Sequence, residues 1–354
     1  MPLTSVELED VATRWTAAMT RGDFEGAWRQ TDRIERERRA LEAAGRFSPR
    51  PYFLTWNGTP LEGRRVLVRC SHGLGDTIQF ARYVPLVRER ARNVCLLVQP
   101  QLLPLFADAA EFGDVRNGWT DETPPEHDVE IEIMELAYAF RSTVETLPRR
   151  VPYLPIPDLD DSGGDLCGLD TSPALNVGVL WAASDWDKTR SVSLHTLEPL
   201  GAVPGVRFYS LQQGPESEEW RNAPLSIEPL HRHTQDIMTA AAAMRKLDLI
   251  ITIDGMAAHL AGALARPVWV LLRHEADWRW MSGRTDSPWY PTMRLFRQPR
   301  PGDWQSVVEH VAAELERLAR STAVRSEPFD FAVRGERNAS EVEPDERLRS
   351  GGTG

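Results

Sequence analysis

Residues 64–83 read RRVLVRCSHGLGDTIQFARY, and this stretch decides the fold class. A short apolar run is followed by two glycines that flank one leucine, then by Asp76 and a helical pattern. A strand, a tight glycine turn and a helix start in this order predict a parallel α/β unit with a ligand site at the turn. We expect Asp76 to cap the helix, with Gln79 as its capping-box partner. Because Gly73 and Gly75 let another molecule approach the backbone, chemistry at Asp76 stays open beside capping.

The familiar short motifs do not identify the site. Gly73 and Gly75 match the first two glycines of a dinucleotide-binding fingerprint, but Ile78 stands where the third would be, so no NAD site follows. A nucleophile-elbow GxSxG, a P-loop and an HExxH motif do not occur in the chain. Their absence excludes the usual hydrolase and nucleotide triphosphatase signatures.

Length and charge limit the classes of protein. A chain of 354 residues predicts about two domains, and 42% hydrophobic with 26% charged residues is ordinary for a globular protein. The formal net charge of -11 argues against nucleic acid as a partner, because phosphates require a basic surface. A local basic pocket for a small anion remains compatible with this charge.

The cysteines and the termini indicate a cytoplasmic protein. Cys70, Cys95 and Cys167 are far apart and show no metal-ligand spacing, which favours a reducing compartment, with Cys70 and Cys95 as small core residues. The N-terminus lacks the pattern of a signal peptide, and no run of 18 apolar residues occurs, so no transmembrane segment is expected.

Four segments follow from the pattern of apolar residues. Over residues 1–46 the pattern predicts two helices that form a hairpin, with the turn at Gly22-Asp23. We expect this hairpin to be the single remnant of a repeat and to pack on the first domain. Strands and helices alternate over 52–158 and again over 170–320, with a turn-rich linker between, which predicts two α/β domains. The final helix, from about Asp303 to Arg320, is expected near their junction, and 321–354 is expected to be disordered.

Three further loops carry unusual residues. Lys188 and Arg190 in WAASDWDKTRS are suited to grip a diphosphate, unless they belong to an ordinary solvated loop. Asp254-Gly255 ends an apolar strand before a small-residue helix, whose first N–H groups suit a phosphate. His259, one turn inside, faces either the same site or the core. The aromatic residues of the fourth loop are suited to stacking on a sugar or a base, but we expect them to pack this loop against the domain: Trp278, Trp280, Trp289 and Tyr290.

Taken together, these motifs identify a family resemblance. GLGDTIQFARYVPL, WAASDWDKTRS, SLQQG, LDLIITIDGMAAHLAGAL and DSPWYP, in this order, resemble glycosyltransferases of the ADP-heptose:lipopolysaccharide heptosyltransferase type (glycosyltransferase family 9). They are most similar to the heptosyltransferase-like domains that follow tetratricopeptide repeats in bacterial proteins, which would make the hairpin tetratricopeptide-like. The resemblance covers about residues 52–318. It implies a GT-B fold: two Rossmann-like domains facing across a cleft, without a metal or other cofactor.

The resemblance also implies roles for individual residues. The family's catalytic carboxylate falls on Asp76 in the glycine loop, and its diphosphate contacts fall on Lys188 and Arg190. Its Asp-(Ser/Thr)-Gly-x-x-His signature falls on residues 254–259, where the hydroxyl residue is missing: Asp254, Gly255, Met256, Ala257, Ala258 and His259. Nucleoside contacts match more loosely, at Gln212, Gln213 and Glu216.

The expected function is transfer of a sugar, with inversion, from a nucleotide sugar to an acceptor hydroxyl of a glycan, a lipid-linked molecule or a protein. A positioned carboxylate would take the proton of the attacking hydroxyl, while cations and a helix N-terminus stabilise the departing diphosphate. Because Gly255 departs from the signature, a GT-B-fold binding or scaffold protein without turnover is the alternative. A sugar-nucleotide epimerase would need a second carboxylate, and the sequence does not indicate one.

Overall fold

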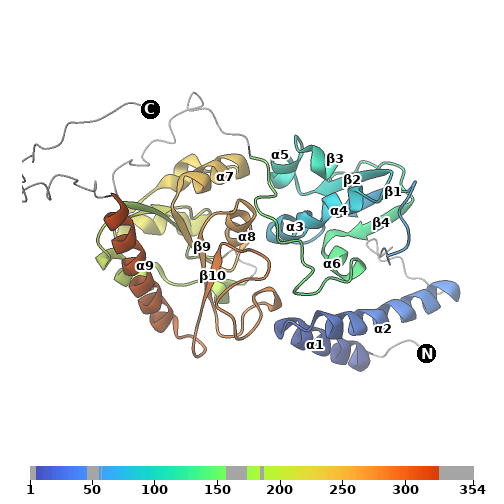
Figure 1. Cartoon of the computed structure of the whole chain (residues 1–354), viewed down its shortest axis with the longest axis horizontal. Helices are drawn as coiled ribbons and strands as arrows, with labels where there is room; N and C mark the ends of the chain where they lie inside the picture. The colour runs from blue at the N-terminus through green and yellow to red at the C-terminus, as the bar shows by residue number, and fades with distance from the viewer. Residues whose placement is uncertain (1–4, 46–55, 57, 157–173, 184–186, 327–354) are drawn as a thin grey trace, which may run out of the picture.

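The computed structural model describes residues 5–45, 56, 58–156, 174–183 and 187–326. Two separate parallel sheets, rather than one continuous sheet, organise this part of the chain (Figure 1). Most of the predicted linker and the segment 327–354 lie outside the described residues. Residues 321–326 were expected to be disordered, but they continue the last helix.

The first sheet has the strand order β3-β2-β1-β4. Its strands are β1 (Arg65–Arg69), β2 (Asn93–Val98), β3 (Asp114–Asn117) and β4 (Val129–Glu132). The helices beside it are short: α3 (Leu74–Phe80), α4 (Val84–Arg88), α5 (Leu103–Phe106) and α6 (Leu136–Ala139). The helical pattern that follows Asp76 is divided between α3 and α4 by a 3-10 turn at 81–83, next to Pro85, whose ring nitrogen has no hydrogen to donate.

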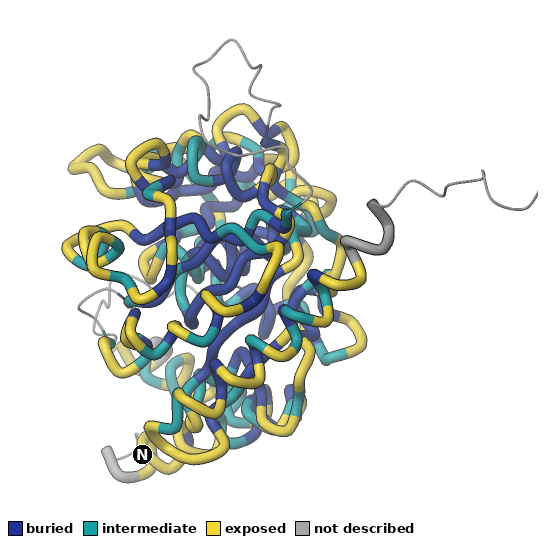
Figure 2. Tube along the Cα trace, turned by 90° about the vertical axis from the view of Figure 1, so that its left-hand side faces the viewer, coloured by how far each residue is buried: buried dark blue, intermediate teal, exposed yellow. Residues whose placement is uncertain are grey.

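The second sheet has the strand order β10-β9-β8-β5-β6-β7, again all parallel. Its strands are β5 (Leu175–Val179), β6 (Val206–Ser210), β7 (Ile227–Glu228), β8 (Leu249–Ile253), β9 (Val268–Leu272) and β10 (Met293–Arg297). Its α-helices are α7 (Ile237–Lys246), α8 (Met256–Ala263) and α9 (Trp304–Ser326). Every residue of β8 and β9 is buried, as expected of strands covered on both faces. Figure 2 shows buried segments running through the interior of the molecule, with exposed segments around them.

The last helix lies on the outer side of the second domain (Figure 1). Val308, Val311 and Leu315 of α9 pack with Leu197 and Phe296 of the same domain. The sequence-based expectation that this helix lies near the domain junction is therefore wrong. Its apolar stripe matches the outer face of the second sheet, which would otherwise be exposed.

The N-terminal segment forms α1 (Ser5–Thr20) and α2 (Phe24–Ala43). On the first domain, the Trp28 indole N–H donates to the Ser142 carbonyl at 2.7 Å. On the second domain, the Trp15 ring meets Trp278 edge-on at 5.2 Å, and the Ser282 N–H donates to the Thr20 carbonyl at 2.7 Å. The pair of helices therefore packs on the first domain, as the sequence predicted, and also contacts the second.

Two of the cysteines behave as predicted. Cys70 and Cys95 are free thiols inside the first domain, and Cys167 lies outside the described residues. None of the helices in the described part of the chain combines the length and apolar character needed to span a bilayer.

The contact between α2 and the first domain predicts a large stability effect. Trp28→Ala should lower the free energy of unfolding by about 3–5 kcal/mol, because the 6% exposed indole leaves a cavity and an unpaired Ser142 carbonyl. Leu8→Ala on α1 is the control, since Leu8 is 45% exposed and should change this free energy by no more than about 0.5 kcal/mol. Urea unfolding of both variants provides the measurement. Equal, small effects would mean that the N-terminal helices are not integrated with the domains.

Candidate active site

Asp76 lies inside the first turn of α3 rather than at its cap. The helix begins at Leu74, so Gly73 takes the N-cap position and Asp76 is the third helical residue. Its Oδ2 accepts the Gly73 N–H at 3.0 Å, so the side chain reaches back to the cap. The prediction that Asp76 caps with Gln79 as its partner is wrong because the helix starts earlier. Gln79 is fully buried instead.

The second oxygen of Asp76 is bound by the second domain. Arg279, in a 3-10 turn at 278–280 after β9, donates from Nη2 to Asp76 Oδ1 at 2.6 Å. The same guanidinium donates to Asp277 Oδ1 at 2.8 Å and to Gln79 Oε1 at 3.0 Å. Burial lowers the pKa of Arg279, but the carboxylates of Asp277 and Asp76 outweigh burial and raise it above its usual value. Arg279 is therefore a charged group shared by both domains.

Gly75 marks a close contact between the domains. A Cβ at this position would lie 2.8 Å from Cδ2 of His259 and 3.4 Å from the Cα of Met256. The His259 ring cannot easily give way, because it stacks on Trp280 and its Nδ1 lies 3.1 Å from the Tyr290 hydroxyl. Gly75 is thus required for the packing of α3 on α8 in this structure.

His259 belongs to the buried side of this contact. Burial, reinforced by nearby Arg279, Arg82 and Arg190, holds its pKa well below the usual value, so the imidazole is neutral near pH 7. Trp280, Trp289 and Tyr290 are also fully buried, which confirms the structural interpretation of the aromatic loop. Of the two readings of His259, the core position is the one the structure shows.

The Asp254-Gly255 turn connects β8 to α8. Gly255 is the N-cap with φ -179° and ψ -176°, an extended conformation open to any residue, and no side chain caps the helix. The Ala258 N–H bonds to the Gly255 carbonyl at 3.1 Å, and Met256 and Ala257 begin the helix before it. N–H groups of a first helical turn lack partners within the helix and suit an anion.

Asp254 binds its proton more tightly than an ordinary aspartate does. Burial, followed by the nearby charge of Asp277, raises its pKa to about 6, although Arg190 opposes this shift. Its carbonyl, rather than its carboxylate, accepts from Arg190 Nη1 at 3.2 Å. Arg190 therefore points at the turn, as predicted for a shared diphosphate site.

Carboxylates lie beside the two cations expected to grip a diphosphate, Lys188 and Arg190. Lys188 Nζ lies 3.9 Å from Glu216, and Arg190 Nε lies 3.8 Å from Asp187. Arg273, which follows β9, lies 3.1 Å from the same Asp187 carboxylate. Three cations thus share two carboxylates, so an incoming anion would have to compete with Asp187 and Glu216.

The three residues expected near a nucleoside have unequal positions. Gln212 is 4% exposed, and its amide accepts from the Trp181 and Ala182 N–H groups at 3.2 and 2.9 Å. Gln213 donates to the His231 and Thr234 carbonyls at 3.0 and 2.9 Å. Both amides therefore hold loops together in this structure, while Glu216 faces Lys188. Contact with a nucleoside stays a prediction.

Three charged residues near the site were missed from the sequence: Arg273, Arg279 and Glu132. Glu132 ends β4 beside β1, is 6% exposed, and accepts the Ser71 N–H at 3.2 Å. Burial raises its pKa to about 7. A second carboxylate therefore holds the loop that carries Gly73 and Asp76. The alternation in VEIE indicates a strand but not that its last carboxylate is buried.

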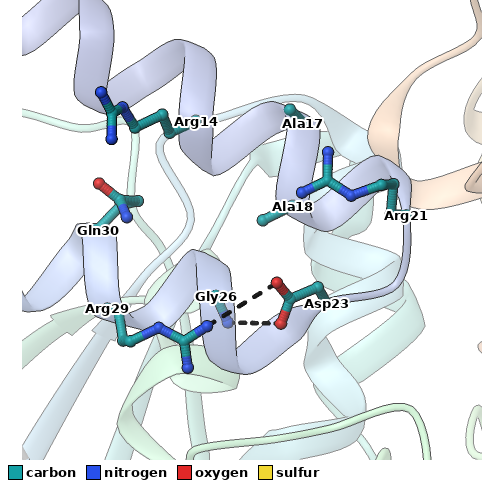
Figure 3. Close-up of a pocket in the computed structure, with 8 residues that line it drawn as sticks. All are labelled: Arg14, Ala17, Ala18, Arg21, Asp23, Gly26, Arg29 and Gln30. Carbon is teal, nitrogen blue, oxygen red and sulfur yellow. Dashed lines mark hydrogen bonds and ion pairs between the residues drawn. The ribbon is translucent and has the colours of Figure 1, made fainter.

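A separate hollow of about 290 Å³ lies on α1 and α2 (Figure 3). The residues that line it include Arg14, Arg21 and Arg29. Arg14 pairs with Asp10 at 2.8 Å, and Arg29 lies 3.9 Å from Asp23. None of the candidate site residues lines this hollow.

Comparisons with known proteins agree with the architecture. No protein-family model matches the chain. The E. coli ADP-heptose lipopolysaccharide heptosyltransferase II structure covers 73% of this chain and 99% of its own, with a TM-score of 0.50 and 14% identity. A glycosyltransferase family 9 structure from Veillonella parvula covers 75% of this chain and 99% of its own, with a TM-score of 0.48 and 11% identity. The parallel sheets and the similarity to the E. coli structure give the chain a heptosyltransferase-like, Rossmann-like α/β fold.

One curated protein, FlbA of Caulobacter vibrioides, is similar in sequence. It is 28% identical over 292 residues, which span 75% of this chain and 48% of FlbA. The chain thus spans about half the length of the curated relative that it matches.

The same substitution at the two glycines of the site should have effects of different size. Gly75→Ser should lower the free energy of unfolding by roughly 1–3 kcal/mol, because its Cβ would overlap the fixed His259 ring. In Gly255→Ser no atom lies within 4 Å of the new Cβ, and the serine hydroxyl can cap the helix. This variant should therefore change the free energy of unfolding by only a few tenths of a kcal/mol. Thermal unfolding of the two variants compares them. A harmless Gly75→Ser would show that α3 and α8 do not pack as described.

Glu132 predicts a pH-dependent stability. Because its pKa is raised from 4.5 to about 7 on folding, ionisation costs stability as the pH rises between these values. Glu132→Gln removes this cost and should raise the free energy of unfolding by about 2–3 kcal/mol at pH 8. At pH 4.5 the variant and the wild type should be nearly equal. Urea unfolding at the two pH values tests the sign, and an equal effect at both would contradict burial of an ionisable Glu132.

Proposed function

We propose that the chain is a glycosyltransferase that moves a sugar from a nucleotide sugar to an acceptor hydroxyl. The observation that carries the proposal is the juxtaposition of two elements. Asp76, at the carboxyl edge of the first sheet, is hydrogen-bonded to the second domain, whose α8 N-terminus packs directly against Gly75. The heptosyltransferase-like fold supports this assignment. A carboxylate and an anion-binding helix start then lie on opposite sides of one junction.

The proposed chemistry is a single displacement with inversion. The Asp76 carboxylate takes the proton of the acceptor hydroxyl as its oxygen attacks the anomeric carbon. The bond from that carbon to the diphosphate oxygen breaks, and the leaving group gains negative charge. The first N–H groups of α8 and the Arg190 guanidinium stabilise this charge, with Lys188 and Arg273 nearby. With these groups in that role, we propose that transfer requires no metal ion.

The donor diphosphate must replace existing ion pairs. Arg190 and Arg273 share Asp187, so binding of a diphosphate exchanges a carboxylate partner for a phosphate partner. We propose an ADP-linked sugar as the first donor to examine, because the E. coli structure of similar fold is an ADP-heptose heptosyltransferase. The proposal extends to a cytoplasmic location and leaves the acceptor open among glycans, lipid-linked molecules and proteins.

The alternative is a binding protein of the same fold without turnover. The missing hydroxyl at Gly255 and the paired cations favour it, because both weaken a diphosphate site. The two functions differ in release of nucleoside diphosphate from the donor. Incubation with ADP-, GDP- and UDP-linked sugars together with candidate acceptors therefore separates them, since a binding protein would retain the donor intact.

Asp76→Asn tests the role of the carboxylate. Transfer should fall by about 100-fold or more, the usual loss when a general base is removed. The variant should also lose some stability, because Arg279 keeps only one carboxylate partner, so rates must be compared per folded molecule. Asp114→Asn is the matched control, since Asp114 lies on the exposed edge strand β3 and pairs with Arg116. Unchanged turnover in Asp76→Asn would remove Asp76 from the mechanism.

A further inference from the structure

Arg279 occupies a position that a charged side chain rarely tolerates. Its side chain is 11% exposed, and its guanidinium lies over the Trp278 ring at 4.5 Å. A buried cation is costly unless it is paired and hydrogen-bonded, and each of its three nitrogens has an acceptor. Asp277 comes from its own loop, while Asp76 and Gln79 come from α3 in the other domain.

These contacts fix both oxygens of the Asp76 carboxylate. Oδ2 is held by the Gly73 N–H, and Oδ1 is held by Arg279. Each carboxylate oxygen accepts at two lone-pair sites, so one site on each remains for a further donor. The Asp76 side chain is 24% exposed and is therefore still open to a substrate hydroxyl. Because both oxygens are hydrogen-bonded, the plane of the carboxylate is held in one orientation. A fixed orientation is what a proton acceptor needs in a near-attack geometry.

The arginine is itself supported by the N-terminal helices. The ring of Trp15 in α1 packs edge-on against the Trp278 ring, with the ring centroids 5.2 Å apart. Trp278 is the residue over which the Arg279 guanidinium lies. Trp278 also contacts Trp289, with ring centroids 6.4 Å apart. A contact path therefore runs from α1 through Trp278 and Arg279 to Asp76. Separation of the domains would break the last step of this path.

We propose that Arg279 is the positioning residue for Asp76, so that the carboxylate is correctly oriented only when the two domains are in contact. This inference rests on the proposed glycosyl transfer and deepens it. Arg279 touches the carboxylate and not the reacting sugar. Its loss should therefore slow turnover while leaving the donor's binding groups at the Asp254-Gly255 turn in place.

The first test separates turnover from binding in the full chain. Arg279→Ala should lower kcat by about 30-fold or more while the donor KM changes by less than about 3-fold. Millimolar guanidinium ion should restore part of kcat, because it can occupy the vacated site beside Asp76, Asp277 and Gln79. Arg279→Lys should be intermediate, since an ammonium cannot bind three acceptors in the geometry of a guanidinium. Wild-type kcat in Arg279→Ala, or loss of kcat without recovery by guanidinium, would overturn the proposal.

Arg284→Ala is the matched control. Arg284 lies in the same loop, but it pairs with Asp286 at 2.7 Å, and Asp286 is 67% exposed. This variant should keep wild-type kcat and should not respond to guanidinium. If guanidinium raises kcat in Arg279→Ala and leaves it unchanged in Arg284→Ala, the ion acts at the vacated site. An equal effect on both variants would indicate a general effect of the ion.

A second test does not depend on activity. Arg279→Met, Asp76→Asn and the double variant form a thermodynamic cycle read out by Tm. If the ion pair joins the domains, Asp76→Asn should lower Tm less than half as much when Arg279 is already Met, because the partner is gone. Additive changes in Tm would overturn the contact.

The two tests also distinguish failure of this inference from failure of the proposed function. Absence of nucleoside diphosphate release by the wild type in the presence of glycan, lipid-linked and protein acceptors would refute glycosyl transfer, and the cycle alone would then decide whether Arg279 holds Asp76. Coupled Tm changes with wild-type kcat in Arg279→Ala would leave a structural contact and reject the positioning role.

Discussion

The Arg279 guanidinium is a buried charge whose compensation requires both domains. Removal of α3 would take away two of its three acceptors, the carboxylate of Asp76 and the amide of Gln79. Arg82 forms the reciprocal contact: it is 4% exposed, belongs to the first domain, and donates to the Trp289 carbonyl at 2.5 Å. An uncompensated buried cation costs several kcal/mol, so these two arginines oppose separation of the domains. The position of Asp76 follows from this constraint.

The rest of the junction is consistent with the same constraint. Because Gly75 has no side chain, α3 lies close enough to α8 for Arg279 to reach Asp76. The neutral His259 ring fills the space that a Cβ at Gly75 would occupy. The N-terminal helices add Trp15 on one side of the junction and Trp28 on the other. These helices are therefore part of the architecture that orients the site.

Sequence patterns predicted the parts of the fold that depend on local signals. Apolar runs bounded by glycine located β1 with α3 and β8 with α8, and the resemblance placed Asp76 and Arg190 on facing loops. The polar edge strand β3 was missed because DVRN has no apolar pattern. The start of α3 was misplaced because glycine serves as its N-cap. Arg279 could not be found, because a charged residue among tryptophans has no periodicity and its carboxylate partner in the other domain, Asp76, lies 203 residues away.

The central claim is that a nucleoside diphosphate binds at the junction of α3 and α8. Hydrogen–deuterium exchange of the full chain, with and without saturating ADP, GDP or UDP, tests this directly. We predict slower exchange at the amides of Met256, Ala257 and residues 188–190 with at least one nucleotide, and no change in β3. Unchanged exchange at these amides with all three nucleotides, or slowing confined to α1 and α2, would contradict the account.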